Sequence, residues 1–216
     1  MQILNLYAGL GGNRKLWSKE YDITAVEIDP DIAKIYQTFF PADTVVVDDA
    51  HQYLLDHFSE FDFIWSSPPC QSHSQMMKAT RHKKRQFPDL KLYEEIIFLS
   101  HFFKGQFVVE NIKPYYRPLI QPTTKIGRHL IWSSYNISDY TGKSILGFIN
   151  KTNTVAGSER LKTFLGLNYD GNIYYKGNHC PGQVLRNCVH PKLGKHILDC
   201  VNIPNQRINN AQLSLF

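Results

Sequence analysis

Cysteine is scarce in this sequence, and long hydrophobic runs are absent. The chain of 216 residues contains four cysteines at irregular spacings, which argues against a disulfide-stapled scaffold. No run approaches the roughly eighteen apolar residues that a membrane span requires, and residues 1–7 lack the basic leader of a secretory signal. The composition, with 43% hydrophobic and 20% charged residues, is that of a globular protein. We therefore expect a cytoplasmic protein with one main domain and no membrane segment.

Acidic residues are absent from one basic segment. Between Gln71 and Gln86 the sequence has no aspartate or glutamate and five basic residues: Lys78, Arg81, Lys83, Lys84 and Arg85. The chain has 24 lysines and arginines against 19 acidic residues, so these five account for the whole net charge of +5. Such a block of like charge is typical of a loop. Two interpretations are open: a solvated surface loop, or a loop that contacts the phosphates of a nucleic acid.

Strand-like and helix-like segments alternate through the first half of the chain. Hydrophobic runs predict strands at residues 2–7, 23–28, 44–47, 61–66 and 106–111. Helical spacing predicts helices at 14–19, 31–40, 50–58 and 89–103, the last with an apolar stripe of Leu92, Tyr93, Ile96, Ile97 and Phe103. This alternation predicts an α/β fold, with a mostly parallel sheet and helices on both faces. The second half is less regular, with a predicted strand at 126–134 and helices at 158–166 and 192–201.

Polar or glycine-rich residues follow five of these predicted strands. The strands end at Tyr7, Ile28, Val47, Ser66 and Val109. Ligands bind outside the carboxyl ends of parallel strands. We therefore expect the residues that follow to form one active-site rim.

The residues after the first three strands favour an adenosine ligand. The first strand leads into Tyr7-Ala8-Gly9-Leu10-Gly11-Gly12, where the absence of Cβ atoms lets the backbone approach a ligand. The third glycine of the dinucleotide fingerprint is missing, because Arg14 occupies its position, which disfavours NAD. Glu27 is placed to bind ribose hydroxyls, and either Asp48 or Asp49 could bind an exocyclic amine. These residues suit an adenosine without a pyrophosphate.

Pro68-Pro69-Cys70-Gln71 follows the fourth strand and precedes the basic segment. Nearby positive charge would lower the pKa of the Cys70 thiol and favour a nucleophilic thiolate, and Glu110 could act as a general acid. Cys200, in contrast, is expected to be a buried structural cysteine. A zinc site could be made of His179, Cys180, Cys188 and His190. It is the weaker alternative, because the spacings of these residues match no standard zinc pattern.

The order of these motifs resembles that of DNA cytosine-5 methyltransferases, in particular small bacterial or phage ones. The resemblance rests on the glycine motif, Glu27-Ile28-Asp29, Pro69-Cys70-Gln71 and Glu110-Asn111-Ile112, and extends over residues 1–134 and again over 158–202. It implies a Rossmann-like methyltransferase fold that binds S-adenosylmethionine and needs no metal. The implied cofactor contacts are Tyr7, Gly9, Gly11, Gly12, Glu27, Ile28, Asp49 and Pro69.

The resemblance also implies a reaction. Cys70 adds to carbon 6 of a cytosine flipped out of DNA, Glu110 gives a hydrogen bond or proton to ring nitrogen 3, and carbon 5 receives the methyl group. The family's later arginine motif keeps only Arg128, which would hold the carbonyl oxygen of the base, and the closing motif keeps Asn187 as a cofactor contact. The expected DNA contacts are Gln71, Ser72, Lys78, Arg81, Lys83, Lys84 and Arg85.

One feature of the family is nearly missing. Residues 135–157 stand where the family has a large target-recognition domain. We expect a catalytic and cofactor-binding core at 1–134, a reduced recognition region at 135–185, a closing motif and helix at 186–202, and a tail at 203–216. Recognition is then shared with the basic segment and residues 168–185, or supplied by a second copy of the chain (a homodimer) or another partner. RNA methylation, a non-catalytic DNA-binding subunit and an inactive relative stay open as alternatives.

The tail ends in Gln212-Leu213-Ser214-Leu215-Phe216 after a polar linker. This pentapeptide resembles the peptides with which bacterial polymerases and repair proteins bind the DNA sliding clamp. In those peptides the glutamine bonds at the edge of a pocket that leucine and phenylalanine fill. A clamp-bound enzyme would meet newly replicated DNA at a raised local concentration. The alternative is that these hydrophobic side chains fold back onto the domain.

Overall fold

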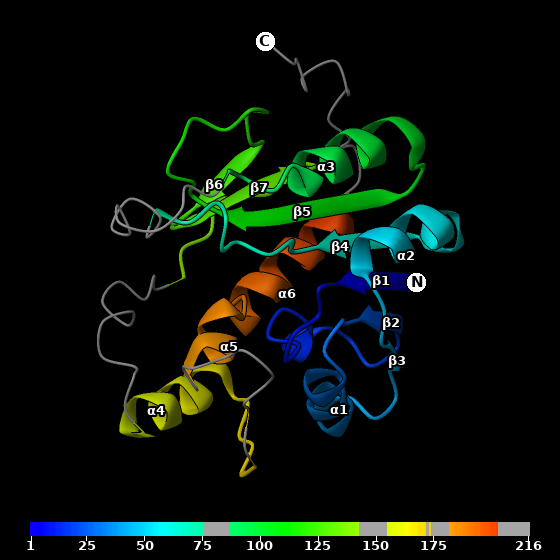
Figure 1. The fold of residues 1–216 in the computed structure, drawn as a ribbon. Coiled ribbons are helices and arrows are strands. Elements are labelled where there is room, and N and C mark those ends of the chain that lie inside the picture. The colour runs from blue at the N-terminus through cyan, green and yellow to red at the C-terminus, as the bar shows by residue number, and fades with distance from the viewer. Residues whose placement is uncertain (76–86, 143–154, 172, 174–181, 203–216) are drawn as a thin grey trace.

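The computed structural model of the chain describes residues 1–75, 87–142, 155–171, 173 and 182–202. Within these residues, the strands form one mixed sheet of seven strands in the order β3-β2-β1-β4-β5-β7-β6 (Figure 1). Strands β1 to β5 run parallel, whereas β7 is antiparallel to β5 and β6 is antiparallel to β7. The strands are β1 Gln2–Leu6, β2 Asp22–Val26, β3 Thr44–Val46, β4 Phe63–Ser66, β5 Gln106–Ile112, β6 Thr124–Ile126 and β7 His129–Ser133.

Helices cover both faces of this sheet, as the alternation of segments predicted (Figure 1). On one face lie α2 and α3, and on the other lie α1 and α6, with α4 and α5 beside them. The helices are α1 Pro30–Phe39, α2 Ala50–His57, α3 Lys91–Phe102, α4 Val155–Leu165, α5 Gly182–Asn187 and α6 Pro191–Asp199. Short 3-10 turns occupy Arg14–Leu16, Phe58–Glu60 and Cys200–Asn202. No helix in the described part of the chain is long and apolar enough to cross a membrane.

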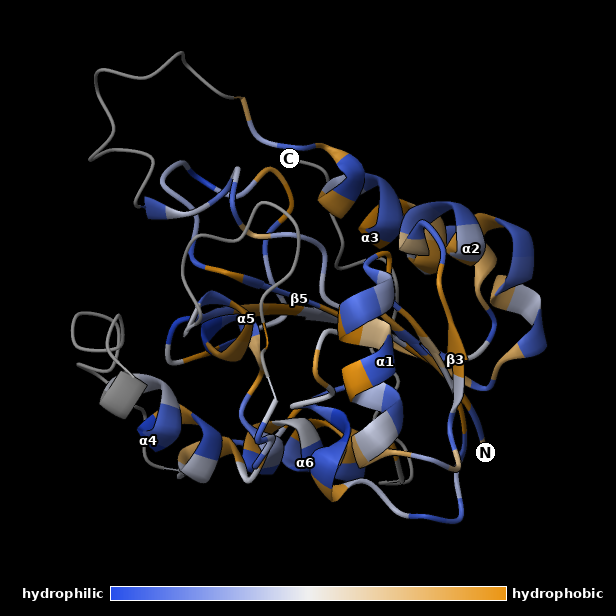
Figure 2. Ribbon diagram, turned by 60° about the horizontal axis from the view of Figure 1, so that its bottom comes forward, coloured by the Kyte–Doolittle hydropathy of each residue, from blue (hydrophilic) through white to orange (hydrophobic). Residues whose placement is uncertain are grey.

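The alternation of side chains along the strands explains the two layers. Leu4 and Leu6 of β1 pack toward α2 and α3, whereas Ile3 packs toward α6, because successive residues of a strand point to opposite faces. Figure 2 shows hydrophobic residues along the strands, while the helices have one hydrophobic and one hydrophilic side. A parallel sheet needs such cover on both faces. The buried cysteine predicted at Cys200 is confirmed, since it is 3% exposed in the layer formed by α6.

Three sequence-based predictions of local structure are corrected. The predicted helix at 14–19 is a single 3-10 turn, and the predicted strand at 126–134 is a hairpin of β6 and β7. Gly127 turns this hairpin with a φ of 57°, a left-handed conformation that glycine adopts without strain. Helix α5, Gly182–Asn187, lies between the predicted helices at 158–166 and 192–201 and is not among the predicted elements. On α3, Ile97 is 41% exposed, and Leu99 is buried in its place.

The described residues after β7 pack against the core. Tyr135 and Ile137 are buried with α6, and the Tyr135 hydroxyl donates to the Ile197 carbonyl at 3.1 Å. Leu161 and Leu165 of α4 share a cluster with α1 and Leu10 of the glycine motif. The expected recognition region therefore contributes a helical layer to the core; its division from 1–134 stays a prediction.

Candidate active site

A cavity of about 140 Å³ opens where β1 to β4 end. It brings together five of the predicted cofactor residues: Tyr7, Glu27, Ile28, Asp49 and Pro69. The rest of its wall comes from the starts of α2 and α3 and from the turn after β4: Ala50, Pro68, His73, Asp89, Lys91 and Leu92. Its walls thus combine three carboxylates (Glu27, Asp49 and Asp89) with apolar surfaces, at the position expected for a ligand of a parallel sheet.

Backbone groups fix the carboxylate of Glu27 at the end of β2. Its Oε2 accepts from the Gly9 amide at 2.9 Å, and its Oε1 accepts from the Asp29 amide at 3.1 Å. Burial raises the pKa of Glu27, while the amides of Asp29 and Gly9 act against this rise. Gly9 has a φ of 53°, so its lack of a side chain lets the loop turn and present this amide.

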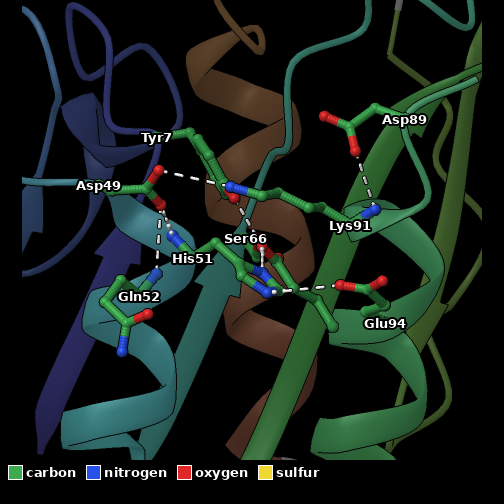
Figure 3. Close-up of polar contacts among 9 residues, drawn as sticks. Tyr7, Asp49, His51, Gln52, Ser66, Asp89, Lys91 and Glu94 are labelled. Carbon is green, nitrogen blue, oxygen red and sulfur yellow. Dashed lines mark hydrogen bonds and ion pairs between the residues drawn. The ribbon is translucent and has the colours of Figure 1, made fainter.

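Asp49, and not Asp48, lines the cavity. Its Oδ1 caps α2 by accepting from the amides of His51 and Gln52 at 2.9 and 3.2 Å, and Lys91 Nζ lies 3.4 Å from Oδ2 (Figure 3). Burial acts to raise the pKa of Asp49, but the Gln52 amide and Lys91 outweigh it and lower the pKa. A carboxylate at the start of a helix is stabilised in this way.

A buried carboxylate, Glu95 of α3, ties three walls of the cavity together. Its oxygens accept from the Tyr7 hydroxyl at 2.6 Å and the Ser66 hydroxyl at 2.5 Å, and His51 Nδ1 lies at 3.1 Å (Figure 3). The Glu95 side chain is fully enclosed, with 0% exposure. The hydrogen bond between His51 and Glu95 raises the pKa of His51. Glu95 is not among the site residues predicted from the sequence, although it lies on the buried face of α3 defined by Leu92 and Ile96.

Tyr7 is held in an unusual backbone conformation. Its φ of 55° is positive, which no other non-glycine residue in the described part of the chain shows. Such a conformation costs of order 1–3 kcal/mol, so it persists only where the surroundings fix it. The hydrogen bond from the Tyr7 hydroxyl to Glu95 holds the side chain in place. Burial strongly raises the pKa of Tyr7, so its hydroxyl stays a donor.

Four predicted cofactor contacts do not line this cavity: Gly9, Gly11, Gly12 and Asn187. A Cβ on Gly11 would lie 2.7 Å from the Tyr36 ring, and one on Gly12 would lie 2.5 Å from the Val189 carbonyl oxygen. These two glycines are therefore required by the packing of the protein itself. Asn187 is exposed at the end of α5. A cofactor role for these four residues stays a prediction.

Cys70 follows β4 in a turn that β5 holds in place. Asn111 Nδ2 donates to the Pro68 carbonyl at 2.9 Å, and the amides of His73 and Ser74 donate to the Cys70 carbonyl at 3.1 and 2.9 Å. The predicted lowering of the thiol pKa is wrong for the described residues: burial raises it, Glu110 raises it further, and Arg128 acts in the opposite direction. The sequence shows the charged neighbours of Cys70 but not its burial, which has the largest effect on the thiol pKa.

Glu110 and Arg128 both lie near enough to Cys70 for their charges to act on its thiol. Glu110 is 5% exposed; its Oε1 lies 2.5 Å from His129 Nδ1, and its Oε2 accepts from the Ser67 hydroxyl at 3.2 Å. Arg128 Nη2 donates to the Arg186 carbonyl at 2.9 Å. The structure thus brings the three predicted catalytic residues together. His129 was missed by the sequence analysis.

Most of the predicted nucleic-acid contacts lie outside the described residues. Gln71 and Ser72 line a shallow depression together with Phe87, and Ser72 Oγ accepts from the Asp89 amide at 3.0 Å. Five basic residues fall outside the description: Lys78, Arg81, Lys83, Lys84 and Arg85. So does the predicted clamp-binding peptide at 212–216.

The alternative zinc site is only partly described, because His179 and Cys180 fall outside the description. Burial raises the pKa of the Cys188 thiol to about 12, against the effect of the amides of Leu10 and Gly12. Within the described ranges, no three His, Cys, Asp or Glu side chains gather as metal ligands.

Comparisons with known proteins agree with this arrangement. A family model for C-5 cytosine-specific DNA methylase matches residues 1–118, which is more than half of the chain. The fold, with its ligand cavity at the strand ends, is that of an α/β S-adenosylmethionine-dependent methyltransferase. The chain belongs to the C-5 cytosine-specific DNA methylase family. The predicted resemblance and fold class are confirmed. No curated protein matches the chain.

Three solved structures are similar to parts of the chain. DNMT2 of Spodoptera frugiperda, in a substituted form, is 26% identical with a TM-score of 0.37, over 52% of this chain and 35% of that one. A protein described as a prophage-encoded DNA modification methyltransferase of E. coli is 21% identical with a TM-score of 0.37, over 54% and 33%. A SAM-dependent methyltransferase from Agrobacterium tumefaciens is 14% identical with a TM-score of 0.38, over 54% and 40%. The chain spans about a third of the length of the first two proteins.

Proposed function

We propose that the protein transfers a methyl group from S-adenosylmethionine to carbon 5 of cytosine in DNA. The observation that supports this most directly is that the end of β5 holds both neighbours of Cys70: Asn111, next to Glu110, donates to the Pro68 carbonyl at 2.9 Å, and the Lys113 amide donates to the Arg128 carbonyl at 2.8 Å. A nucleophile, an acid and a cation at one point suit the covalent activation of a pyrimidine ring. The membership of the chain in the cytosine-specific family supports the same substrate.

The cavity beside Cys70 fits the adenosine part of S-adenosylmethionine. In this proposal, the Glu27 carboxylate, which the Gly9 amide fixes, accepts hydrogen bonds from ribose hydroxyls, and Asp49 of the same cavity accepts from an exocyclic amine. Pro69, Leu92 and Ile28 supply apolar surface for a purine ring. The donor and acceptor chemistry of this lining therefore matches the cofactor that the family uses.

The chemical difficulty is that carbon 5 of cytosine is a weak nucleophile. The sulfur of the Cys70 thiolate forms a bond to carbon 6, while Glu110 gives its proton to ring nitrogen 3, so that carbon 5 becomes the nucleophilic end of an enamine. S-adenosylmethionine supplies an electrophilic methyl group, which carbon 5 accepts. Loss of the proton from carbon 5 then expels the Cys70 sulfur and restores the aromatic ring. Arg128 exchanges its bond to the Arg186 carbonyl for the carbonyl oxygen of the base.

The raised thiol pKa has a consequence for this mechanism. Burial raises the pKa of Cys70, so the thiol gives up its proton in the complex with the nucleic acid, where the Glu110 carboxylate accepts it and becomes the acid that protonates ring nitrogen 3. The guanidinium of Arg128 lowers the pKa of Cys70 and stabilises that thiolate. The reactive form is thereby tied to the presence of the substrate, which protects the free enzyme from side reactions.

The proposed partners follow from the sequence. We expect the basic segment to contact DNA phosphates, and a second copy of the chain or another partner to complete target recognition. Residues 212–216 are proposed to bind the bacterial sliding clamp. The test is binding of purified clamp to the full chain and to a chain ending at Ala211. Equal binding by both chains, or binding by neither, would refute this partner.

Methyl transfer from tritiated S-adenosylmethionine tests the proposed function. The full chain is given duplex DNA, single-stranded DNA and RNA in parallel, and we expect label in duplex DNA. Duplex DNA with 5-fluorocytosine should form an adduct that resists denaturation, because fluorine blocks the last elimination. Label in RNA alone would identify an RNA methyltransferase. Binding of DNA without label or adduct would identify a non-catalytic subunit.

A further inference from the structure

His129 contacts the carboxylate of Glu110, and the reaction as written leaves this contact without a role. His129 begins β7, which is antiparallel to β5 and pairs His129 with Ile112 and Ile131 with Glu110. Glu110 and His129 are therefore diagonal neighbours on one face of the sheet, within reach of long side chains. The distance from Nδ1 to Oε1 is 2.5 Å, and the two side chains are 13% and 7% exposed.

The neighbours of His129 determine which nitrogen holds the proton. Arg128 Nε donates to His129 Nε2 at 3.5 Å, and arginine cannot accept a hydrogen bond. Nε2 is therefore the acceptor of the neutral ring, and Nδ1 holds the hydrogen that is donated to Glu110 Oε1. The ring is thus oriented toward the carboxylate as a donor.

A second chain of donors reaches the other oxygen of Glu110. The Trp65 indole donates to Ser67 Oγ at 2.8 Å, and the Ser67 hydroxyl donates to Oε2 at 3.2 Å. An indole N–H can only donate, so the Ser67 proton is directed toward Glu110. His129 holds one oxygen of the Glu110 carboxylate and Ser67 holds the other. These two contacts fix the plane of the carboxyl group beside Cys70.

We propose that His129 is the positioning residue of Glu110. This inference rests on the proposed function and deepens it. When nitrogen 3 of cytosine takes the proton, the O–H bond of Glu110 breaks, its electron pair stays on the carboxylate, and an N–H bond forms on the base. His129 keeps its own proton and donates a charge-assisted hydrogen bond to the new anion. The contact therefore strengthens during the step that activates the ring.

Two variants of His129 separate this role from simple packing. His129→Leu removes the donor and keeps apolar bulk, whereas the side-chain amide of His129→Asn keeps a donor near the position of Nδ1. A hydrogen bond to a charged group is worth about 1.5–3 kcal/mol, so we expect His129→Leu to lower kcat by ~10- to 100-fold. KM for S-adenosylmethionine should stay within about twofold, because His129 does not line the cofactor cavity. His129→Asn should recover most of kcat.

The matched control is His101→Asn, since His101 is exposed on α3 and contacts the Ile97 carbonyl; its kcat should equal that of the wild type. Formation of the 5-fluorocytosine adduct should slow in His129→Leu by the same factor as kcat. Unchanged kcat in His129→Leu, or an equal loss in His129→Asn, would overturn the inference.

A spectroscopic measurement keeps the inference testable even if the protein methylates no nucleic acid. Nitrogen-15 NMR of labelled histidine should show His129 with hydrogen on Nδ1, and the His129 signal should shift in Glu110→Gln. Hydrogen on Nε2, or an unmoved signal, would refute the contact itself. Absence of methyl transfer together with hydrogen on Nδ1 would refute the proposed function and leave the His129–Glu110 contact established.

Discussion

Two buried carboxylates, Glu95 and Glu110, serve the same rim of strand ends in different ways. Glu95 has no exposed surface and is bonded to side chains from the loop after β1, from α2 and from β4. Glu110 has two side-chain partners, keeps slight exposure and acts on Cys70. A carboxylate enclosed by donors from three elements fixes geometry, whereas one left partly open beside a nucleophile can exchange a proton. Enclosure, more than charge, distinguishes the two roles.

The substitution with the largest expected effect removes methyl transfer and leaves cofactor binding unchanged. Cys70→Ser should lower methyl transfer by roughly 10⁴-fold or more, because the nucleophile is lost. Binding of S-adenosylmethionine, measured by calorimetry, should stay within about twofold, since Cys70 is not among the residues that line the cavity. Ordinary turnover by Cys70→Ser would remove the covalent mechanism.

Glu95→Ala should lower both the stability of the protein and its affinity for the cofactor. It leaves Tyr7, Ser66 and His51 without their shared partner, and we expect a loss of about 3 kcal/mol in the free energy of unfolding, measured with urea. Cofactor affinity should fall by ~10-fold, because the Tyr7 wall is no longer fixed. The control is Glu94→Gln, whose side chain is 61% exposed and whose stability should stay within about 0.5 kcal/mol. Equal effects of the two substitutions would show that Glu95 does not organise the cavity.

Neutralising the basic segment should leave both carboxylate sites intact. Replacing Lys83, Lys84 and Arg85 by alanine should weaken DNA binding similarly for all sequences. The slope of log affinity against log salt should flatten by up to about three units. Cofactor affinity should not change. An unaltered salt slope would identify the segment as a solvated surface loop.

The smallest expected effect is a pH dependence of stability. Hydrogen bonding to Glu95 raises the pKa of His51, with Glu94 adding to this rise and both burial and Lys91 opposing it. The stabilising contribution is fully present below about pH 6.5 and is lost as the pH rises through the raised pKa of the folded state. The difference in urea midpoint between wild type and His51→Gln should therefore shrink from pH 5.5 to pH 8.5. A difference that grows with pH would reverse the assignment.

Local patterns allowed much of the site to be predicted from the sequence. Glu27 directly follows β2 and Asp49 comes three residues after the end of β3, and their place at one rim follows from the parallel sheet. The burial of Glu95 is also visible in the sequence, because this acid lies within the apolar stripe of α3. The contact between His129 and Glu110 depends on the register of β5 and β7, which the merged strand predicted at 126–134 concealed. The raised pKa of Cys70 depends on burial, which no local pattern shows.

The glycine loop after β1 is packed against residues from the far end of the chain. A Cβ on Gly12 would lie 2.8 Å from Cys188 Cβ, and one on Gly194 of α6 would lie 2.6 Å from Asn13 Cα. The loop that presents the Gly9 amide to Glu27 is therefore completed by residues almost two hundred positions later in the chain. A nascent polypeptide can align β1 to β5 while this loop is still open, because such non-local contacts form only after the distant segment has left the ribosome. We therefore expect this loop to reach its final packing only after α6 has been synthesised.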